Sequence, residues 1–267
     1  MKKTILITGA TDGIGLETAK LLAFDGHNLL IHGRDIQKLN SVKTLLAATP
    51  YSGNISAYLA DLSDFSEVTK LISEIRSEYQ HLDVLINNAG VFKTNNSLTA
   101  HGLDVRFVVN TISPYMLTQA LLPLLGHLGR VINLSSAAQA PVNIQAVRGV
   151  VKLSDMQAYS QSKLAITMWS FVMAQKTKDD GPTVIAVNPG SLLASKMVKE
   201  GFGVEGNDLA IGAKILQRMA LEEGMSEHSG QYFDNDSGQF ALPHADATNL
   251  QKSAEVVQVI ESIIKNK

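Results

Sequence analysis

Short aliphatic runs alternate with longer segments of helical periodicity along the chain, and this alternation restricts the fold more than any other feature. The runs typical of strands are 3–8, 28–32, 55–59, 82–86, 130–134, 183–187 and 230–233. The segments typical of helices are 13–24, 35–48, 64–79, 103–125, 156–178, 207–222 and 249–265. Strands separated by helices pair in parallel, because each helical crossover returns the chain to the same end of the sheet. The pattern predicts the α/β class, with a doubly wound, seven-stranded parallel sheet and helices on both faces.

Composition indicates one domain with a substantial core. The chain has 267 residues, 45% of them hydrophobic, and shows no Ser- or Pro-rich linker and no repeat at which a second domain could begin. We therefore expect residues 1–267 to form one domain. The net charge of −2 creates no field that would attract nucleic acid or an anionic membrane. The absence of cysteine excludes disulfides and thiolate chemistry and fits a reducing compartment, so we expect a cytoplasmic protein.

The longest stretch without Asp, Glu, Lys or Arg runs from residue 107 to 129. It contains Asn110, Ser113 and Gln119 and two prolines, which are too many polar groups and helix breakers for a bilayer span. We therefore expect a buried helix here and no transmembrane segment.

A glycine-rich turn follows the first expected strand and opens the first expected helix. In this context closely spaced glycines bring backbone N–H groups and a helix N-terminus close to a pyrophosphate. The spacing here is Gly-x-x-x-Gly-x-Gly, and an ordinary strand-to-helix turn is the alternative interpretation. The candidate cofactor-binding residues of this turn are Thr8, Gly9, Thr11, Asp12, Gly13, Ile14 and Gly15.

The end of the second strand should select between nicotinamide cofactors. An acid there accepts the adenosine ribose hydroxyl, whereas an Arg pairs with the 2′-phosphate of NADP(H). Gly33 occupies the position expected for the acid, and Arg34 follows it, which favours NADP(H). Asp35 could hold the ribose of NAD(H) instead, although its position before Ile36 also suits a helix N-cap.

Polar and small residues follow the third and fourth strands, at the edge where doubly wound sheets bind ligands. Each has an alternative role, because Asx side chains also cap turns and helices. The candidate cofactor-binding residues here are Asp61, Leu62, Asn88, Ala89 and Gly90.

Tyr159 and Lys163 lie four residues apart on one expected helix face, so the phenol and the ammonium can converge on one ligand. A phenol that exchanges protons near neutral pH needs about 4 kcal/mol of preferential phenolate stabilisation. An ammonium about 4.5 Å away supplies about 3.7 kcal/mol at an effective dielectric of about 20. The pair can therefore act as a proton donor and acceptor.

These motifs together resemble the short-chain dehydrogenase/reductase family, a group of Rossmann-fold proteins, over nearly the whole chain to about Phe233. The motifs in family order are TGATDGIG at 8–15, NNAG at 87–90, Asn110, Ser136, YSQSK at 159–163 and Asn188-Pro189-Gly190. Within the family, the segments around His101 and the 130–136 strand look like the retinol dehydrogenase and WW-domain oxidoreductase branch, whose members mostly use NADP(H).

The resemblance implies a catalytic set of Asn110, Ser136, Tyr159 and Lys163. In the family, the tyrosine is the general acid/base and the serine polarises the carbonyl. The lysine binds the nicotinamide ribose and lowers the tyrosine pKa. The asparagine supports a proton-relay water at a local break in its helix. Tyr159 and Lys163, together with Pro189 and Gly190, are also expected at the cofactor.

Ser136 is preferred to Ser135 because the family places the catalytic serine second in the pair. Alternation along a strand would also turn Ser135 to the opposite face.

Two segments depart from the family pattern. Ser195 is at best a displaced substitute for the threonine that contacts the carboxamide in many members. The interval 137–158 is longer than in compact members, and its apolar residues could wall a substrate pocket or pack as an extended loop.

Residues 191–206 are expected to form a substrate lid, with an apolar surface that includes Leu192, Leu193, Met197, Val198 and Phe202 and glycine hinges. An apolar surface there favours an apolar aldehyde or ketone as substrate.

The resulting hypothesis is an NADP(H)-preferring oxidoreductase that interconverts an alcohol and a carbonyl compound, with NAD(H) as the alternative cofactor. A non-catalytic NADP(H)-binding regulatory or scaffold protein is the alternative function. No histidine spacing indicates a metal site. By analogy with the family we expect a homodimer or homotetramer. The apolar side chains of the Tyr159 helix could form its interface, or else be buried within one chain. These are Met168, Trp169, Phe171, Val172 and Met173.

Overall fold

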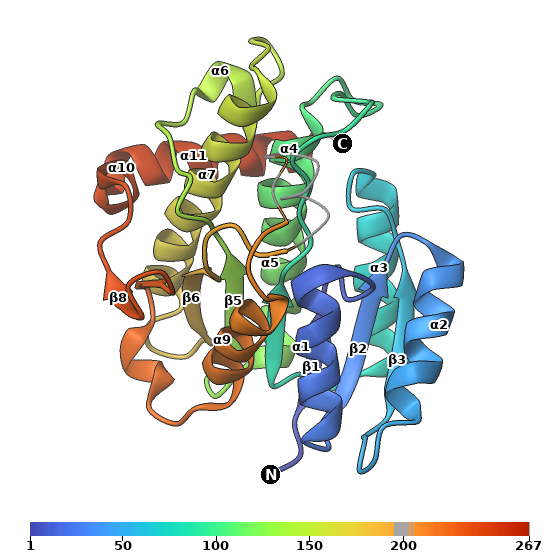
Figure 1. Ribbon diagram of the computed structural model, residues 1–267. Coiled ribbons are helices and arrows are strands. Elements are labelled where there is room, and N and C mark those ends of the chain that lie inside the picture. Colours follow the sequence, from blue (N-terminus) through green and yellow to red (C-terminus); the bar gives the residue numbers. More distant parts are fainter. Residues whose placement is uncertain (195–202, 204, 267) are drawn as a thin grey trace.

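The strands of the computed structural model form one sheet between two layers of helices (Figure 1). The structure describes residues 1–194, 203 and 205–266. The strands are β1 (Thr4–Ile7), β2 (Asn28–Gly33), β3 (Ile55–Leu59), β4 (Val84–Asn87), β5 (Arg130–Leu134), β6 (Thr183–Asn188), β7 (Tyr232–Asp234) and β8 (Gln239–Ala241). Their order is β3-β2-β1-β4-β5-β6-β7-β8. The order reverses between β1 and β4, and a crevice for ligands forms at such a point.

The helices are α1 (Gly13–Phe24), α2 (Ile36–Ala47), α3 (Phe65–Glu78), α4 (Val105–Phe107), η1 (Val108–Ile112), α5 (Ser113–Leu125), α6 (Ile144–Val147), α7 (Asp155–Lys176), α9 (Leu209–Leu221), η2 (Met225–His228), α10 (Ala245–Thr248) and α11 (Leu250–Lys265). Side chains of α1, α2 and α9 pack on one face of the sheet, and those of α3, α5 and α7 pack on the other. The α/β class and the helices on both faces are therefore confirmed.

The sheet differs from the expectation in having eight strands. The first seven pair in parallel, but β8 runs antiparallel to β7. The turn from Asp234 to Gly238 is short enough to make a hairpin, and Gly238 adopts a positive φ of 72° in it. A three-residue strand at the sheet edge gives too short an alternation to be recognised in the sequence.

The long uncharged segment forms α4, η1 and α5 in succession. By length and composition, the stretch Val105–Leu125 is apolar enough to cross a membrane, and 67% of its most apolar window is buried inside the protein. Core helices of folded domains pass the same test, so this is weak evidence for a span. Its side chains belong to the core between α3, α7 and the sheet.

The C-terminal helix α11 lies against α7 (Figure 1). Its residue Glu261 accepts a hydrogen bond from the Tyr115 hydroxyl on α5 (2.7 Å) and pairs with Lys176 at the end of α7 (3.5 Å). Trp169 and Met173, which were expected candidates for a subunit interface, are buried within this one chain. Any self-association must therefore use other side chains than these.

Candidate active site

The glycine turn between β1 and α1 is fixed by contacts with the segment after β4. Asn88 Nδ2 donates to the carbonyls of Thr8 (2.9 Å) and Gly9 (3.0 Å), and the Thr8 hydroxyl accepts from the N–H groups of Asn88 and Ala89 (both 3.1 Å). Gly9 and Gly13 have positive φ values of 65° and 55°. The two expected cofactor-binding segments are therefore directly joined.

Gly15 is a steric requirement of the same turn. A Cβ atom on Gly15 would lie 2.3 Å from the Gly9 carbonyl oxygen and 2.3 Å from Asn88 Nδ2. This close approach leaves the N-terminus of α1 directly behind the turn, with the Asp12 side chain capping Gly13 N–H. The geometry is that of a dinucleotide cradle, in which the backbone must approach the ligand closely.

His32 is a buried support of this turn that the sequence interpretation missed. Its Nδ1 accepts from Gly9 N–H (3.2 Å), and its Nε2 lies 3.0 Å from the Ala60 carbonyl, so the neutral ring donates from Nε2. The His32 backbone carbonyl accepts from Ala10 N–H (2.9 Å). Burial lowers the pKa of His32 from 6.5 to about 4, with smaller opposing contributions from the Ala60 carbonyl and Asp61. Only the hydrogen-bonding pattern of the folded chain reveals this role.

We expect His32 to make the fold acid-sensitive. Its pKa is lower in the folded chain than the ordinary 6.5, so the unfolded chain takes up a proton first as the pH falls. Its stabilising contribution is complete above pH 6.5 and decreases towards pH 4, by about 3 kcal/mol in total. Urea unfolding at pH 7 and pH 4 measures this loss. The control His32→Gln should be less stable at pH 7 but lose about 3 kcal/mol less on acidification; an equal pH dependence of the two proteins would contradict the assignment.

The end of β2 lies beside the glycine turn. A Cβ atom on Gly33 would lie 2.5 Å from Thr11 Cγ2, so only glycine fits between the two segments. Arg34 is exposed next to this contact and forms no ion pair with the part of the chain that the structure describes. Asp35 caps α2 by accepting from the N–H groups of Gln37 (2.9 Å) and Lys38 (3.0 Å). Of the two roles considered for Asp35, the structure therefore shows the helix N-cap.

Asp61 and Leu62 follow β3 at the same edge of the sheet. Asp61 accepts from Ser63 N–H (2.8 Å), which is the turn role considered as its alternative, and Asp64 rather than Asp61 caps α3. The Leu62 carbonyl accepts from the Ser113 hydroxyl (2.6 Å), which joins this edge to α5.

Asn110 lies in a π-helical turn, η1, so the expected break in its helix is present. Its side chain accepts from Val91 N–H (2.8 Å) and donates to the Val91 carbonyl (2.9 Å) and the Ser162 hydroxyl (2.9 Å). Ser162 in turn donates to the Tyr159 carbonyl (2.7 Å). Asn110 therefore holds the loop after β4 against the helix that carries Tyr159 and Lys163.

Ser136, Tyr159 and Lys163 meet above the ends of β4 and β5. The Ser136 side chain lies beside the buried Tyr159 phenol and acts to lower its pKa. Lys163 Nζ donates to the Leu134 carbonyl (2.7 Å) and lies 5.7 Å from the centre of the Tyr159 ring. The ring of Phe92 packs on the other side of Tyr159, with centroids 5.0 Å apart. The three polar groups face each other in an apolar surrounding.

The electrostatics of this group differ from the sequence expectation. Burial raises the pKa of Tyr159 above its ordinary 10, and the neighbouring Ser136 side chain only partly opposes this. Burial also lowers the pKa of Lys163 to about 8. Burial dominates here, and Lys163 Nζ donates to the Leu134 carbonyl, so the lowering of the tyrosine pKa by the ammonium stays a prediction.

The two adjacent serines, which follow the end of β5, have different partners. The Ser135 hydroxyl is buried and bonds the Lys163 carbonyl (3.1 Å) and the Thr167 hydroxyl (2.7 Å). The Ser136 carbonyl accepts from Gln139 Nε2 (3.0 Å) and from the Tyr232 hydroxyl (3.2 Å). Neither Gln139 nor Tyr232 was expected at the site. Tyr232 lies in β7, which is separated from β5 by β6, so only the folded chain brings its hydroxyl to Ser136.

The turn at Pro189 and Gly190 is held by the hairpin β7–β8. Asp236 accepts from the N–H of Ser191 (2.8 Å), from its hydroxyl (2.5 Å) and from Asn188 Nδ2 (2.9 Å). Asn235 donates to the Pro189 carbonyl (2.9 Å). The tail beyond Phe233 thus supports the site from one side, a role the sequence left open.

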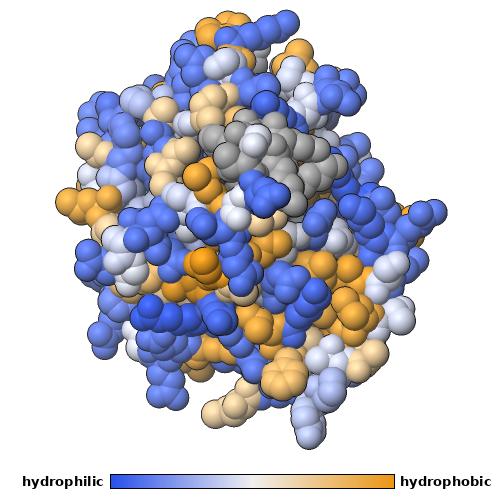
Figure 2. Space-filling view, viewed as in Figure 1, coloured by the Kyte–Doolittle hydropathy of each residue, from blue (hydrophilic) through white to orange (hydrophobic). Residues whose placement is uncertain are grey.

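The expected lid falls largely outside the described residues, including Ser195, Met197, Val198 and Phe202. In the view of Figure 2, apolar residues show between hydrophilic ones over α1 and α9. In the long interval 137–158, Ala146 and Val147 pack into the core whereas Val150 is 71% exposed. This interval therefore contributes partly to packing.

The sequence pattern of the family described as short chain dehydrogenase matches residues 3–203. The chain belongs to this family. Retinol dehydrogenase 12 of Bos taurus is 32% identical over 263 residues, covering 91% of this short-chain dehydrogenase and 81% of the bovine protein. Retinol dehydrogenase 13 of Homo sapiens is 28% identical over 272 residues, covering 91% and 80%. These relatives support the resemblance to the retinol dehydrogenase branch and an NAD(P)-dependent oxidoreductase that acts on alcohol or carbonyl groups.

A short-chain dehydrogenase of Burkholderia cenocepacia J2315, solved in complex with NADP, has a similar structure. It superposes with a TM-score of 0.70 at 26% identity, covering 87% of this short-chain dehydrogenase and 95% of that chain. This likeness supports a nicotinamide cofactor for a protein of this family and fold.

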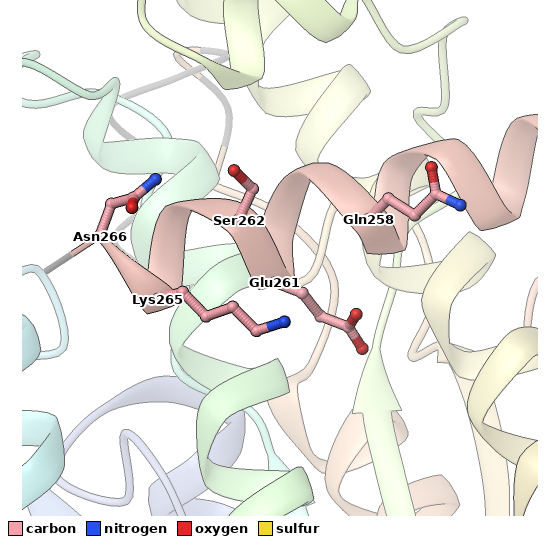
Figure 3. A pocket seen from close by; sticks show the side chains of 5 residues that line it. All are labelled: Gln258, Glu261, Ser262, Lys265 and Asn266. Carbon is pink, nitrogen blue, oxygen red and sulfur yellow. The ribbon is translucent and has the colours of Figure 1, made fainter.

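A shallow hollow on α11 lies apart from this site (Figure 3). It is lined by Gln258, Glu261, Ser262, Lys265 and Asn266, and Glu261 and Lys265 extend on the same side of the helix. None of the expected site residues lines it, so we do not assign the substrate to it.

Proposed function

We propose that this chain is an NADP(H)-preferring oxidoreductase that interconverts an alcohol and an apolar aldehyde or ketone. The observation that carries the proposal is the meeting of Ser136, Tyr159 and Lys163 after β5, at the same edge of the sheet as the glycine turn after β1. A phenol and a hydroxyl that lie side by side can bind one carbonyl oxygen between them. The names of the retinol dehydrogenase relatives support an apolar substrate.

The residues present fit a nicotinamide dinucleotide. Gly9 and Gly13 have positive φ, and Gly15 leaves no room for a Cβ atom, so the turn lets a pyrophosphate approach the N-terminus of α1. Arg34 offers an exposed guanidinium at the end of β2, where the 2′-phosphate of NADP(H) would lie.

In the reductive direction, we propose that Tyr159 donates its phenolic proton to the substrate carbonyl oxygen and that Ser136 donates a hydrogen bond to the same oxygen. When bound, the cofactor supplies the hydride. Lys163 holds a cationic charge next to the phenol, which stabilises the phenolate left after proton transfer. Phe92 covers the phenol with an apolar ring and limits the access of water.

Cofactor preference is tested by replacing Arg34 with Leu. We expect the dissociation constant of NADPH to rise about 30-fold, because a charge-assisted bond to phosphate is lost, and that of NADH to change less than about threefold. Titration followed by nicotinamide fluorescence measures both constants. Arg76→Leu is the matched control, since Arg76 is exposed in the last turn of α3, which lies at the amino ends of the strands and away from Arg34. Tighter binding of NADH than NADPH by the unchanged protein would overturn the preference.

A further inference from the structure

Arg106 is among the largest fully buried side chains of the protein, and the proposed chemistry does not use it. It lies in α4, and its side chain is 1% exposed. Nε and Nη2 form a two-pronged pair with the Asp104 carboxylate, at 2.8 and 2.6 Å. Nη1 donates to the Asp155 carboxylate and to the Phe92 carbonyl (3.4 Å). One guanidinium therefore connects three separate segments.

Each of these segments carries or contacts a residue of the candidate active site. Asp155 is the first residue of α7, and Tyr159 follows it by one helical turn. Asn110 follows Arg106 by four residues, in η1. The Phe92 ring packs on the Tyr159 ring, and the neighbouring Val91 is held at both its N–H and its carbonyl by Asn110.

A buried guanidinium is costly unless its donors are satisfied, so the cluster has one geometry rather than several. The planar fork fixes direction as well as distance, because two parallel hydrogen bonds bind Asp104. Asp155 is different, since 49% of its side chain is exposed, and its contact with Arg106 is the part of the cluster that reaches α7. If Arg106 only stabilised the fold, its pair with Asp104 would be enough. The additional contact with Asp155 joins it to the first turn of the helix that carries Tyr159.

We propose that Arg106 is a positioning residue that fixes the first turn of α7, and with it Tyr159, relative to Asn110 and Phe92. Ser154 and Gln157 cap the start of α7, and Arg106 holds its first turn through Asp155. Through the Phe92 carbonyl, Arg106 holds the loop whose ring covers the phenol. Arg106 and Asp155 touch neither substrate nor cofactor in this role. The inference rests on the proposed carbonyl reduction, because that reaction requires the phenol to be placed accurately.

Asp155→Ala tests the proposal with little risk to folding, because Asp155 is half exposed and the Arg106–Asp104 pair stays intact. We expect kcat for NADPH-dependent reduction of octanal or retinal to fall about 10-fold, with the dissociation constant of NADPH changed less than about twofold. Asp155→Asn keeps an acceptor for Arg106 and should recover most of kcat. Hydrogen exchange should become faster at the amides of residues 156–162 in Asp155→Ala, a readout that does not depend on activity.

Asp246→Ala is the matched control. Asp246 also lies in the first turn of a helix and pairs with a cation, Lys252 (2.6 Å), but it contacts no residue of the site. Arg106→Lys is a second variant, in which one ammonium cannot serve three partners, so kcat should again fall. Unchanged kcat and exchange in Asp155→Ala, with an active parent protein, would overturn this inference alone. An inactive parent protein would overturn the proposed function and this inference with it.

Discussion

Replacing Tyr159 by Phe is expected to lower kcat at least about 1,000-fold while changing the dissociation constant of NADPH less than about twofold. The hydroxyl is the only part removed, and the Tyr159 ring keeps its contact with the Phe92 ring. The ring therefore keeps its place, and the loss is confined to the proton donor.

Steady-state reduction of octanal or retinal by NADPH, with a parallel fluorescence titration, measures both quantities. Tyr115→Phe is the matched control, since it also removes a buried hydroxyl, the one that donates to Glu261 (2.7 Å). We expect Tyr115→Phe to lose stability but to keep kcat. Retention of kcat by Tyr159→Phe would show that another group transfers the proton.

Replacing Gly15 by Ala is expected to weaken NADPH binding at least about 30-fold, which corresponds to about 2 kcal/mol, and to destabilise the fold by about 3 kcal/mol. The added Cβ atom would lie 2.3 Å from the Gly9 carbonyl oxygen, which is backbone and cannot move like the end of a side chain. The overlap must push the glycine turn away from the N-terminus of α1.

Gly238→Ala separates this effect from the ordinary cost of losing a glycine. Gly238 has a positive φ of 72° in the β7–β8 turn, and an added Cβ atom there meets nothing within 4 Å. We expect a loss of about 1 kcal/mol from backbone strain and no change in NADPH affinity. Equal NADPH affinities of Gly15→Ala and the parent protein would contradict the cradle assigned to this turn.

Much of the fold could be predicted because local signals and tertiary contacts agree. The strands β1, β2, β4, β5 and β6 are short, mostly aliphatic runs buried on both faces, and the first helix begins directly after the glycine turn. The edge strand β8 was missed because three residues carry no usable periodicity, and the division of the expected helix 103–125 into α4, η1 and α5 depends on contacts made by Asn110.

The residues of the candidate site were easier to predict than their energetics. The sequence spacing placed Tyr159 and Lys163 on one helix face, and the structure brings them together with Ser136. It could not show that Lys163 donates to the Leu134 carbonyl, or that burial raises the pKa of the phenol. His32, Arg106 and Gln139 were missed because each has a partner that is 14 or more residues away in the sequence.

Direct hydride transfer is the central claim, and isotope labelling tests it most directly. The protein is incubated with retinal or octanal and with NADPH that carries deuterium on the transferable C4 position, and the alcohol product is analysed by mass spectrometry. We expect one deuterium on the former carbonyl carbon of the product, at a rate that Tyr159→Phe lowers at least about 1,000-fold. Oxidation of NADPH without transfer of deuterium to the product, or no reaction with any apolar aldehyde or ketone, would contradict the proposed function.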